Sequence, residues 1–201
     1  MSINVCNDRS MASITSLPSG VTGSNLVLLS TQTASSSATI NFTSGIDSTY
    51  KEYQFHFINI HPGTDDADTY ILASIDSGSN YNVAVTSTFV QSVAAESGGS
   101  PSVDYLTSKD VALSTGGAAI EHSVGADNDQ SSSGILHLFN PAGTTFVKNF
   151  ISRMQISHAV NNAQDIYVSG HFNTTSAIDA IQFKKNTGNI DSGTIKMYGV
   201  L

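Results

Sequence analysis

The sequence predicts an all-β protein, an antiparallel β-sandwich of jelly-roll-like type that is preceded by an extended N-terminal arm. Three observations lead to this fold class. Charged residues make up only 12% of the 201 residues, and Ser, Thr, Gly, Asn and Asp, which favour turns over helix interiors, take their place. Short apolar runs alternate with polar residues at the period of a strand. No window of helical length carries apolar residues at the helical period.

The expected strands follow one another along the chain and are separated by turn residues. In the stretch KEYQFHFINI (51–60), Tyr53, Phe55 and Phe57 share one face, and the alternation then shifts at Ile58 and Ile60. This shift predicts a β-bulge or burial on both faces. The region 105–113 is compatible with either a short helix or a strand. The other expected strands lie at 37–43, 69–75, 135–139, 146–157, 166–168, 180–183 and 195–201. Roughly eight to ten strands with regularly spaced turns favour a sandwich over other all-β folds.

The chain divides into two parts by composition. Residues 1–23 form the predicted N-terminal arm, because Pro18, Gly20 and Gly23 stand among Ser, Thr and scattered apolar residues. Residues 24–201 form the predicted β-sandwich domain. The single cysteine, Cys6, lies on the arm and has no intrachain partner for a disulfide, so we expect a free thiol there.

The charge of the chain excludes two classes of partner. The formal net charge is −8, and no cluster of Lys and Arg exceeds the pair Lys184–Lys185. A nucleic-acid backbone or an anionic membrane surface would be repelled, so we expect no nucleic acid and no membrane as partners. The first residues carry no apolar core of a signal peptide, which predicts a protein made in a cytoplasm.

One acidic stretch, GADNDQSSSG (125–134), is the main candidate for a metal site. Asp127, Asn128 and Asp129 offer oxygen ligands of the kind that calcium prefers. However, Ser131 stands where a calcium loop needs Asp or Asn, and no Glu follows Glu121. The alternative interpretation is an Asx turn that leads into the strand at 135–139. The turn is favoured, and calcium is kept as a weak alternative for these three residues.

The remaining polar residues give no catalytic pattern. Asp65, Asp66 and Asp68 are expected in a hairpin loop with solvated carboxylates, and a glycosidase acid pair would need a defined separation across a cleft. His56 and His137 are expected on the strand faces opposite the aromatic side chains. No nucleophile elbow, phosphate loop, dinucleotide fingerprint or cysteine pair occurs. We therefore expect no enzyme, no catalytic residue and no cofactor.

Three stretches together resemble a family of virion structural proteins of tailed bacteriophages, especially marine and cyanobacterial phages. They are NLVLLSTQTASSSATINFTSGIDSTYKEYQFHFINIHPGTD (25–65), DNDQSSSGILHLFNPAGTTFVKNFIS (127–152) and NTTSAIDAIQFKKNTGNIDSGTIKMYGVL (173–201). In particular, the end of the chain, where an AIDAIQF strand is followed by IDSGTIKMYG, is similar to the end of many members. The resemblance implies a β-sandwich that is part of the virion and is made in the host bacterial cytoplasm. Such proteins serve variously as head decoration, tail or fibre material, and no catalytic motif is associated with them.

The expected function is therefore structural. We expect a capsid decoration or cement protein, or a tail or fibre protein, that contacts copies of itself, as a homotrimer, and the major capsid protein or other tail and baseplate proteins. A module on the virion that binds a host glycan is the first alternative, supported by the polar loops and by exposed tyrosines. A polysaccharide depolymerase that uses Asp127 and Asp129 is the second.

Overall fold

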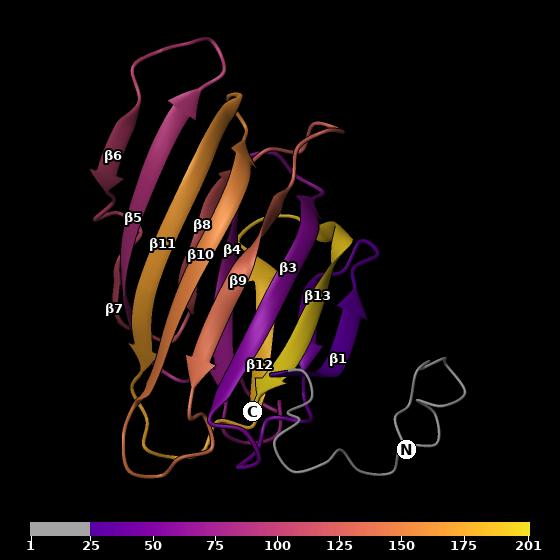
Figure 1. The fold of residues 1–201 in the computed structure, drawn as a ribbon, viewed down its shortest axis with the longest axis vertical. Helices are drawn as coiled ribbons and strands as arrows, with labels where there is room; N and C mark the ends of the chain where they lie inside the picture. The colour runs from indigo at the N-terminus through magenta and orange to yellow at the C-terminus, as the bar shows by residue number, and fades with distance from the viewer. Residues whose placement is uncertain (1–24) are drawn as a thin grey trace, which may run out of the picture.

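The computed structural model describes residues 25–201, which form thirteen β-strands, all paired antiparallel (Figure 1). No helix occurs in this range, and so none is long and apolar enough to cross a membrane. The predicted arm and Cys6 lie outside the described residues. The strands are β1 (Leu26–Thr33), β2 (Thr39–Phe42), β3 (Glu52–Pro62), β4 (Ala67–Ser74), β5 (Val85–Ala95), β6 (Ser102–Tyr105), β7 (Val111–Ser114), β8 (Ala118–Val124), β9 (Ser132–Phe139), β10 (Lys148–His158), β11 (Asn162–Phe172), β12 (Ala180–Lys185) and β13 (Ile190–Val200).

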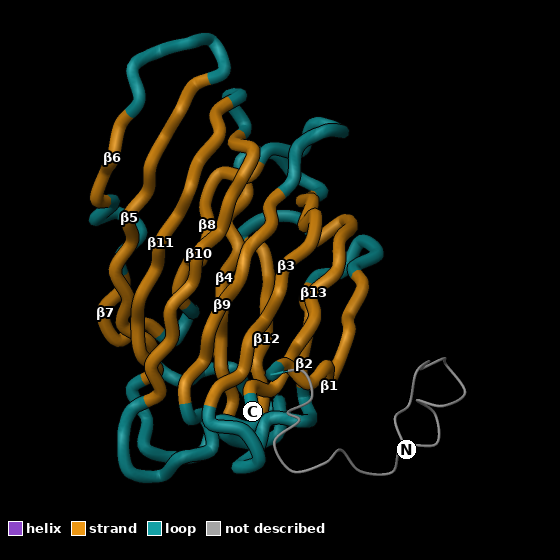
Figure 2. Tube along the Cα trace, in the orientation of Figure 1, coloured by secondary structure: helices purple, strands orange, loops and turns teal. Residues whose placement is uncertain are grey.

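The strands form two layers. The large sheet has the order β1-β13-β3-β9-β10-β11-β5, and both β6 and β7 pair with the far edge of β5. The small sheet, β8-β4-β12-β2, lies behind it (Figures 1 and 2). Among the named strands, the two sheets join through one residue pair, His158 of β10 with Val124 of β8. At the other edge of the small sheet, Ser37, which precedes β2, forms an isolated bridge with Ile190 of β13. The described residues therefore make a sandwich whose layers are connected at two corners.

The chain alternates between the two layers, as in a jelly roll. Consecutive strands from β1 to β5 belong to the large and the small sheet in turn, and the same alternation returns from β7 to β9 and from β11 to β13. Two runs of consecutive strands stay within the large sheet: β5, β6 and β7, and the meander of β9, β10 and β11. The predicted all-β, antiparallel, jelly-roll-like sandwich is confirmed.

Aromatic side chains fill the space between the sheets. Phe55 of the large sheet lies with its ring centroid 5.2 Å from that of Phe42 and 5.3 Å from that of Phe183, both of the small sheet. All three are almost completely buried, and each contributes roughly 1.5–3 kcal/mol by leaving water. The face of β3 that carries Tyr53, Phe55 and Phe57, predicted to point inward, therefore forms one wall of the core.

The expected irregularity in β3 is a bulge. The register of β3 against β9 shifts between Phe57 and Ile60, and Asn59 has a φ of 50°. The neighbouring strand β13 adapts with Gly193, whose φ is 114°. A Cβ at this glycine would lie 2.5 Å from the carbonyl oxygen of Asn59, so the bulge requires glycine here.

The structure has more strands than the roughly eight to ten predicted, because several strands carry polar residues on their inward face. In β5, Ser87 and Gln91 are buried, and in β8, Glu121 and His122 are buried. These residues hide the alternation that marks a strand. β11 extends beyond the predicted 166–168, and the undecided region 105–113 contains a turn followed by β7.

Candidate functional site

The outward side of the large sheet is the most distinctive surface of the described residues. We call it the outer face. It consists of outward side chains of six strands: Lys196 and Tyr198 of β13; Glu52, Gln54, His56 and Ile58 of β3; Ser133, Ile135 and His137 of β9; Ile151, Arg153 and Gln155 of β10; Asp165, Tyr167 and Ser169 of β11; Thr88, Val90 and Ser92 of β5.

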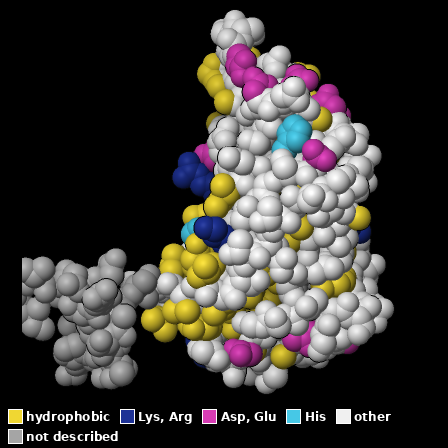
Figure 3. All heavy atoms as spheres, turned by 90° about the vertical axis from the view of Figure 1, so that its right-hand side faces the viewer, with side chains coloured by type: hydrophobic (Ala, Val, Ile, Leu, Met, Phe, Trp, Pro, Cys, Tyr) yellow, Lys and Arg dark blue, Asp and Glu magenta, His cyan; other side chains and the backbone are white. Residues whose placement is uncertain are grey.

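Apolar side chains are exposed across the outer face. Ile58, Ile135, Ile151 and Tyr167 are between 37% and 48% exposed. A shallow groove of about 800 Å³ lies over β9, β10, β11 and β5, and Ile135, Ile151 and Tyr167 line it. Hydrophobic side chains also gather along the left margin of Figure 3, the side on which the large sheet lies. An exposed apolar area of this kind commonly marks an interaction surface.

The strand register places the central residues of the groove in one row. Ile135 pairs with Arg153, Arg153 pairs with Tyr167, and Tyr167 pairs with Val90. Neighbouring strands lie about 4.8 Å apart, so these side chains touch across the sheet. The row is therefore built by four strands, and no single stretch of the sequence contains it.

A cluster of three polar residues occupies the middle of this row. The Arg153 guanidinium donates through Nη2 to Asp165 Oδ2 at 2.7 Å and through Nε to Oδ1 at 3.0 Å. The Tyr167 hydroxyl donates to the same Oδ2 at 3.1 Å, and the guanidinium carbon lies 5.1 Å from the Tyr167 ring centroid. Hydrogen bonds from Arg153 hold the pKa of the Asp165 carboxyl below its ordinary value. The charges of this cluster are therefore neutralised within it.

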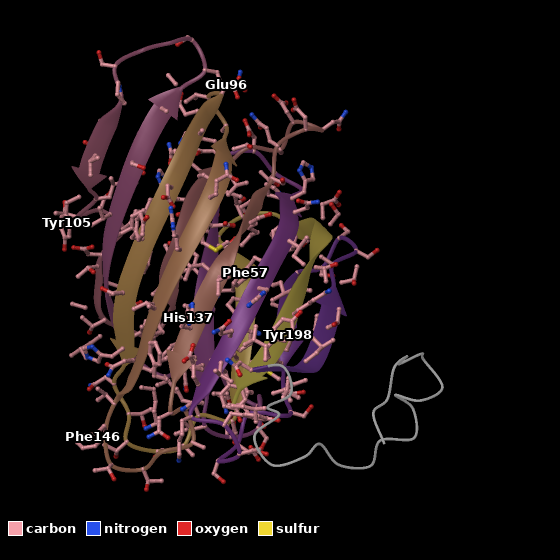
Figure 4. All side chains as sticks on the ribbon, in the orientation of Figure 1. Phe57, Glu96, Tyr105, His137, Phe146 and Tyr198 are labelled. Carbon is pink, nitrogen blue, oxygen red and sulfur yellow. The ribbon has the colours of Figure 1, made fainter. Side chains whose placement is uncertain are left out.

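A second polar cluster lies on the β3 side of the outer face. His137 Nδ1 is 2.7 Å from Glu52 Oε1, and Gln54 Nε2 donates to the same oxygen at 3.0 Å. Burial raises the pKa of Glu52, but the hydrogen bonds from His137 and Gln54 outweigh it and leave the pKa lowered. The His56 ring packs on Tyr198, with centroids 4.7 Å apart. Figure 4 shows His137 and Tyr198 on this side of the sheet, and His56 and His137 lie opposite the aromatic core, as predicted.

The calcium candidates lie in a turn at one end of the sandwich. The main-chain N–H of Gln130 donates to the carbonyl oxygen of Asp127 at 2.8 Å, and β9 begins two residues later. A turn at 127–130 precedes the strand, as predicted, but a main-chain carbonyl closes it and not the side chain of an Asx turn. Asn128 and Asp129 line a polar hollow of about 460 Å³ together with Asp191. Within residues 25–201, no group of three or more His, Cys, Asp or Glu residues is arranged to hold a metal ion.

The second acidic stretch is divided by the fold. Asp65 lies in the β3–β4 loop, and its Oδ1 accepts a hydrogen bond from the N–H of Ala126 at 3.0 Å, so both acidic loops lie at one end of the sandwich. Acidic side chains gather at that end in Figure 3. Asp68, in contrast, is 3% exposed and pairs with Lys109 at 2.6 Å. The expectation of solvated carboxylates is wrong for Asp68, because it is the second residue of the buried strand β4.

Sequence reasoning missed the polar cluster of Arg153, Asp165 and Tyr167. Ile151 and Arg153 are two residues apart in FVKNFISRMQIS, so they share one face of the strand. However, the partners come from β11, and only the register of the hairpin between β10 and β11 brings Asp165 diagonally opposite Arg153. A correct register for this hairpin would have found the pair.

Comparisons with known protein families, with curated proteins and with solved structures find no match for this chain.

Proposed function

We propose that this protein is a structural component of a tailed bacteriophage virion, a capsid decoration or cement protein or a tail or fibre protein, that works through protein contacts. The sequence resemblance supports the class of particle. The observation that carries the proposed mode of action is the outer face, where exposed apolar side chains surround the paired charges of Arg153 and Asp165. Its partners are virion proteins, such as the major capsid protein or other tail and baseplate proteins.

Paired charges make this face suitable for a protein contact. Covering an isolated charge is costly, but Arg153 and Asp165 keep their bidentate contact when water is removed. Tyrosine and arginine are also enriched among the residues that dominate protein interfaces. A partner can therefore bury the apolar area around Arg153 and Asp165 without leaving either charge uncompensated.

The same geometry makes glycan binding a weaker alternative. A sugar stacks on an open aromatic ring, but the guanidinium of Arg153 covers one face of the Tyr167 ring. The carboxylate of Asp165 already accepts hydrogen bonds from both neighbours. A sugar that binds through these groups has to displace contacts that a protein partner leaves intact.

The experiment that tests the proposed function is quantitative mass spectrometry of purified virions of the phage that encodes the chain. A copy number of the same order as that of the major capsid protein supports head decoration. A few to a few tens of copies, as expected for a structure at one vertex, supports a tail or fibre role. Absence from the particle overturns the proposal and returns attention to the glycan-binding alternative.

Lysine footprinting of the particle tests the mode of action. Lys196 lies on the outer face, and Lys184 points outward from the small sheet; both are half-buried and form no ion pair within the described residues. Acetylation of intact virions should spare Lys196 and modify Lys184, whereas the chain unfolded in urea should react at both. Equal reactivity of Lys196 in the particle and in the unfolded chain would contradict a contact through this face.

A further inference from the structure

We infer that a second copy of this chain covers the outer face, so that the protein associates with itself through its large sheet. This inference rests on the proposed function and names the first partner of the same surface. Three properties of the face support it: its area, its charge compared with the rest of the chain, and the internal pairing of its polar groups.

The area of the outer face matches that of a stable protein interface. β3, β10, β11 and β5 each have eleven residues, so they are about 36 Å long at about 3.3 Å per residue. Five strands from β3 to β5 are about 24 Å wide at about 4.8 Å per strand. The product is on the order of 850 Å², and a standard interface buries about 800 Å² on each partner.

Electrostatics favour this face for contact between identical chains. Two copies that each carry a net charge of −8 repel each other. The charged members of the outer face are the cations Arg153 and Lys196 and the carboxylates Glu52 and Asp165, and they sum to zero. Many of the other carboxylates lie in turns, as at Asp65 and Asp129. Two copies therefore meet with little repulsion when these neutral faces are in contact.

The internal pairing of its polar groups also suits contact with an identical face. A second copy presents the same apolar side chains and the same neutral cluster of Arg153 and Asp165, so these two residues need no charged partner from the other side. A highly charged partner would gain nothing from Arg153 or Asp165, since both are already engaged with each other.

Analytical ultracentrifugation of the whole chain at micromolar concentration tests this inference. The wild type is expected to sediment as an oligomer of the 21.1 kDa chain. The variant Ile151→Lys places an unpaired charge in the centre of the contact, so the dissociation constant should rise by about tenfold or more. The variant Thr88→Lys, on β5, makes the same test without removing an apolar side chain.

The matched control is Ile75→Lys. Ile75 is 45% exposed and Ile151 is 48% exposed, but Ile75 lies in the bend after β4, away from the outer face. This variant should associate like the wild type, and circular dichroism should show the same fold for all three variants. A wild type that is monomeric at micromolar concentration overturns the inference. Association that survives both face variants, or that Ile75→Lys weakens equally, overturns it as well.

Failure of this inference differs from failure of the proposed function. A chain that is present in the virion but monomeric in solution refutes self-association alone, and its outer face then contacts another virion protein. A chain that associates through this face but is absent from the virion refutes the structural role alone.

Discussion

Two ion pairs, each joined by a hydroxyl donor, lie in opposite environments of the sandwich. Inside, Lys185 Nζ of β12 donates to Glu121 Oε1 of β8 at 3.0 Å, and the hydroxyl of Thr69, on the intervening strand β4, donates to the same oxygen. Outside, Arg153 and Asp165 form the corresponding pair, with Tyr167 as the hydroxyl donor. The side chains of the inner pair are 0% exposed, whereas that of Arg153 is 67% exposed.

The comparison shows how the environment decides what an ion pair contributes. On β12, Lys185 shares its inward face with Phe183, which contacts the aromatic core. Removing both charges of the inner pair from water is expensive, and Glu121 Oε2 has no hydrogen-bond partner. Each inner charge therefore depends on the other. Water competes for the outer pair, so it contributes little to the folding free energy and is free to serve a surface contact.

The largest expected effect comes from removing one inner charge. Lys185→Met keeps an apolar chain of similar length but leaves Glu121 buried without its cation. The free energy of unfolding should fall by about 3–5 kcal/mol, measured by chemical denaturation. The adjacent variant Lys184→Met is the control, because Lys184 points away from the core, and it should stay close to the wild type. A similar loss from both variants would contradict the role assigned to the buried pair.

Removing both inner charges should restore most of this stability. In the double variant Lys185→Met and Glu121→Leu, no unpaired charge remains in the core, so its free energy of unfolding should lie much closer to the wild type than that of the single variant. Thr69 then loses its acceptor, which leaves a residual cost of about 1–3 kcal/mol. If the double variant is as unstable as Lys185→Met, lost packing rather than an uncompensated charge explains the first result.

The folding stability should also depend on pH, because His122 is buried. This effect is expected to be smaller than that of removing one inner charge. Burial lowers the pKa of His122 below its ordinary value of 6.5, and the nearby Lys109 adds to this effect. Between the folded pKa and 6.5 the unfolded chain binds a proton that the folded chain does not. The stability that His122 contributes is therefore present above pH 6.5 and is lost as the pH falls below it.

This dependence is measured by urea unfolding at several pH values on both sides of 6.5, the ordinary pKa. His122→Gln removes the titrating group, so its free energy of unfolding should fall less steeply with pH than that of the wild type. The slope is compared, not the absolute stability, because the variant also alters the contact with Gln91. An unchanged slope would contradict the assignment to His122. Burial also lowers the pKa of His158 and of His56, and the slope would then be assigned to these residues.

The sequence predicted the fold where polar and apolar residues alternate, and it failed where the core itself is polar. The alternation of Tyr53, Phe55 and Phe57 identified β3, and the shift after Phe57 identified its bulge. β8 was missed because Glu121 and His122 point to buried positions. The partner of Glu121 is 64 residues away, and only the strand order of the small sheet brings Lys185 near it.

The outer face was predicted only in part, for a related reason. Alternation assigns each side chain to a face of its own strand, and it correctly placed His56 and His137 away from the core. It does not say which strands are neighbours, so the groove over β9, β10, β11 and β5 was not foreseen. The acidic turn around Asp127 drew attention instead, because its residues are adjacent in the sequence.

The smallest effect on folding is expected for the outer pair. Arg153→Ala should unfold at nearly the same denaturant concentration as the wild type, because its guanidinium is exposed to water. Its consequence should appear locally: the pKa of Asp165 should rise toward its ordinary value, which NMR titration of the carboxyl carbon measures directly.

Arg153→Lys is the matched control, since it keeps the charge but loses the two-point contact. The pKa of Asp165 in this variant should lie between those in the wild type and in Arg153→Ala. A loss of folding stability as large as that of Lys185→Met would show that exposure does not separate the two pairs, and the outer face would then be part of the folding core rather than a surface for contact.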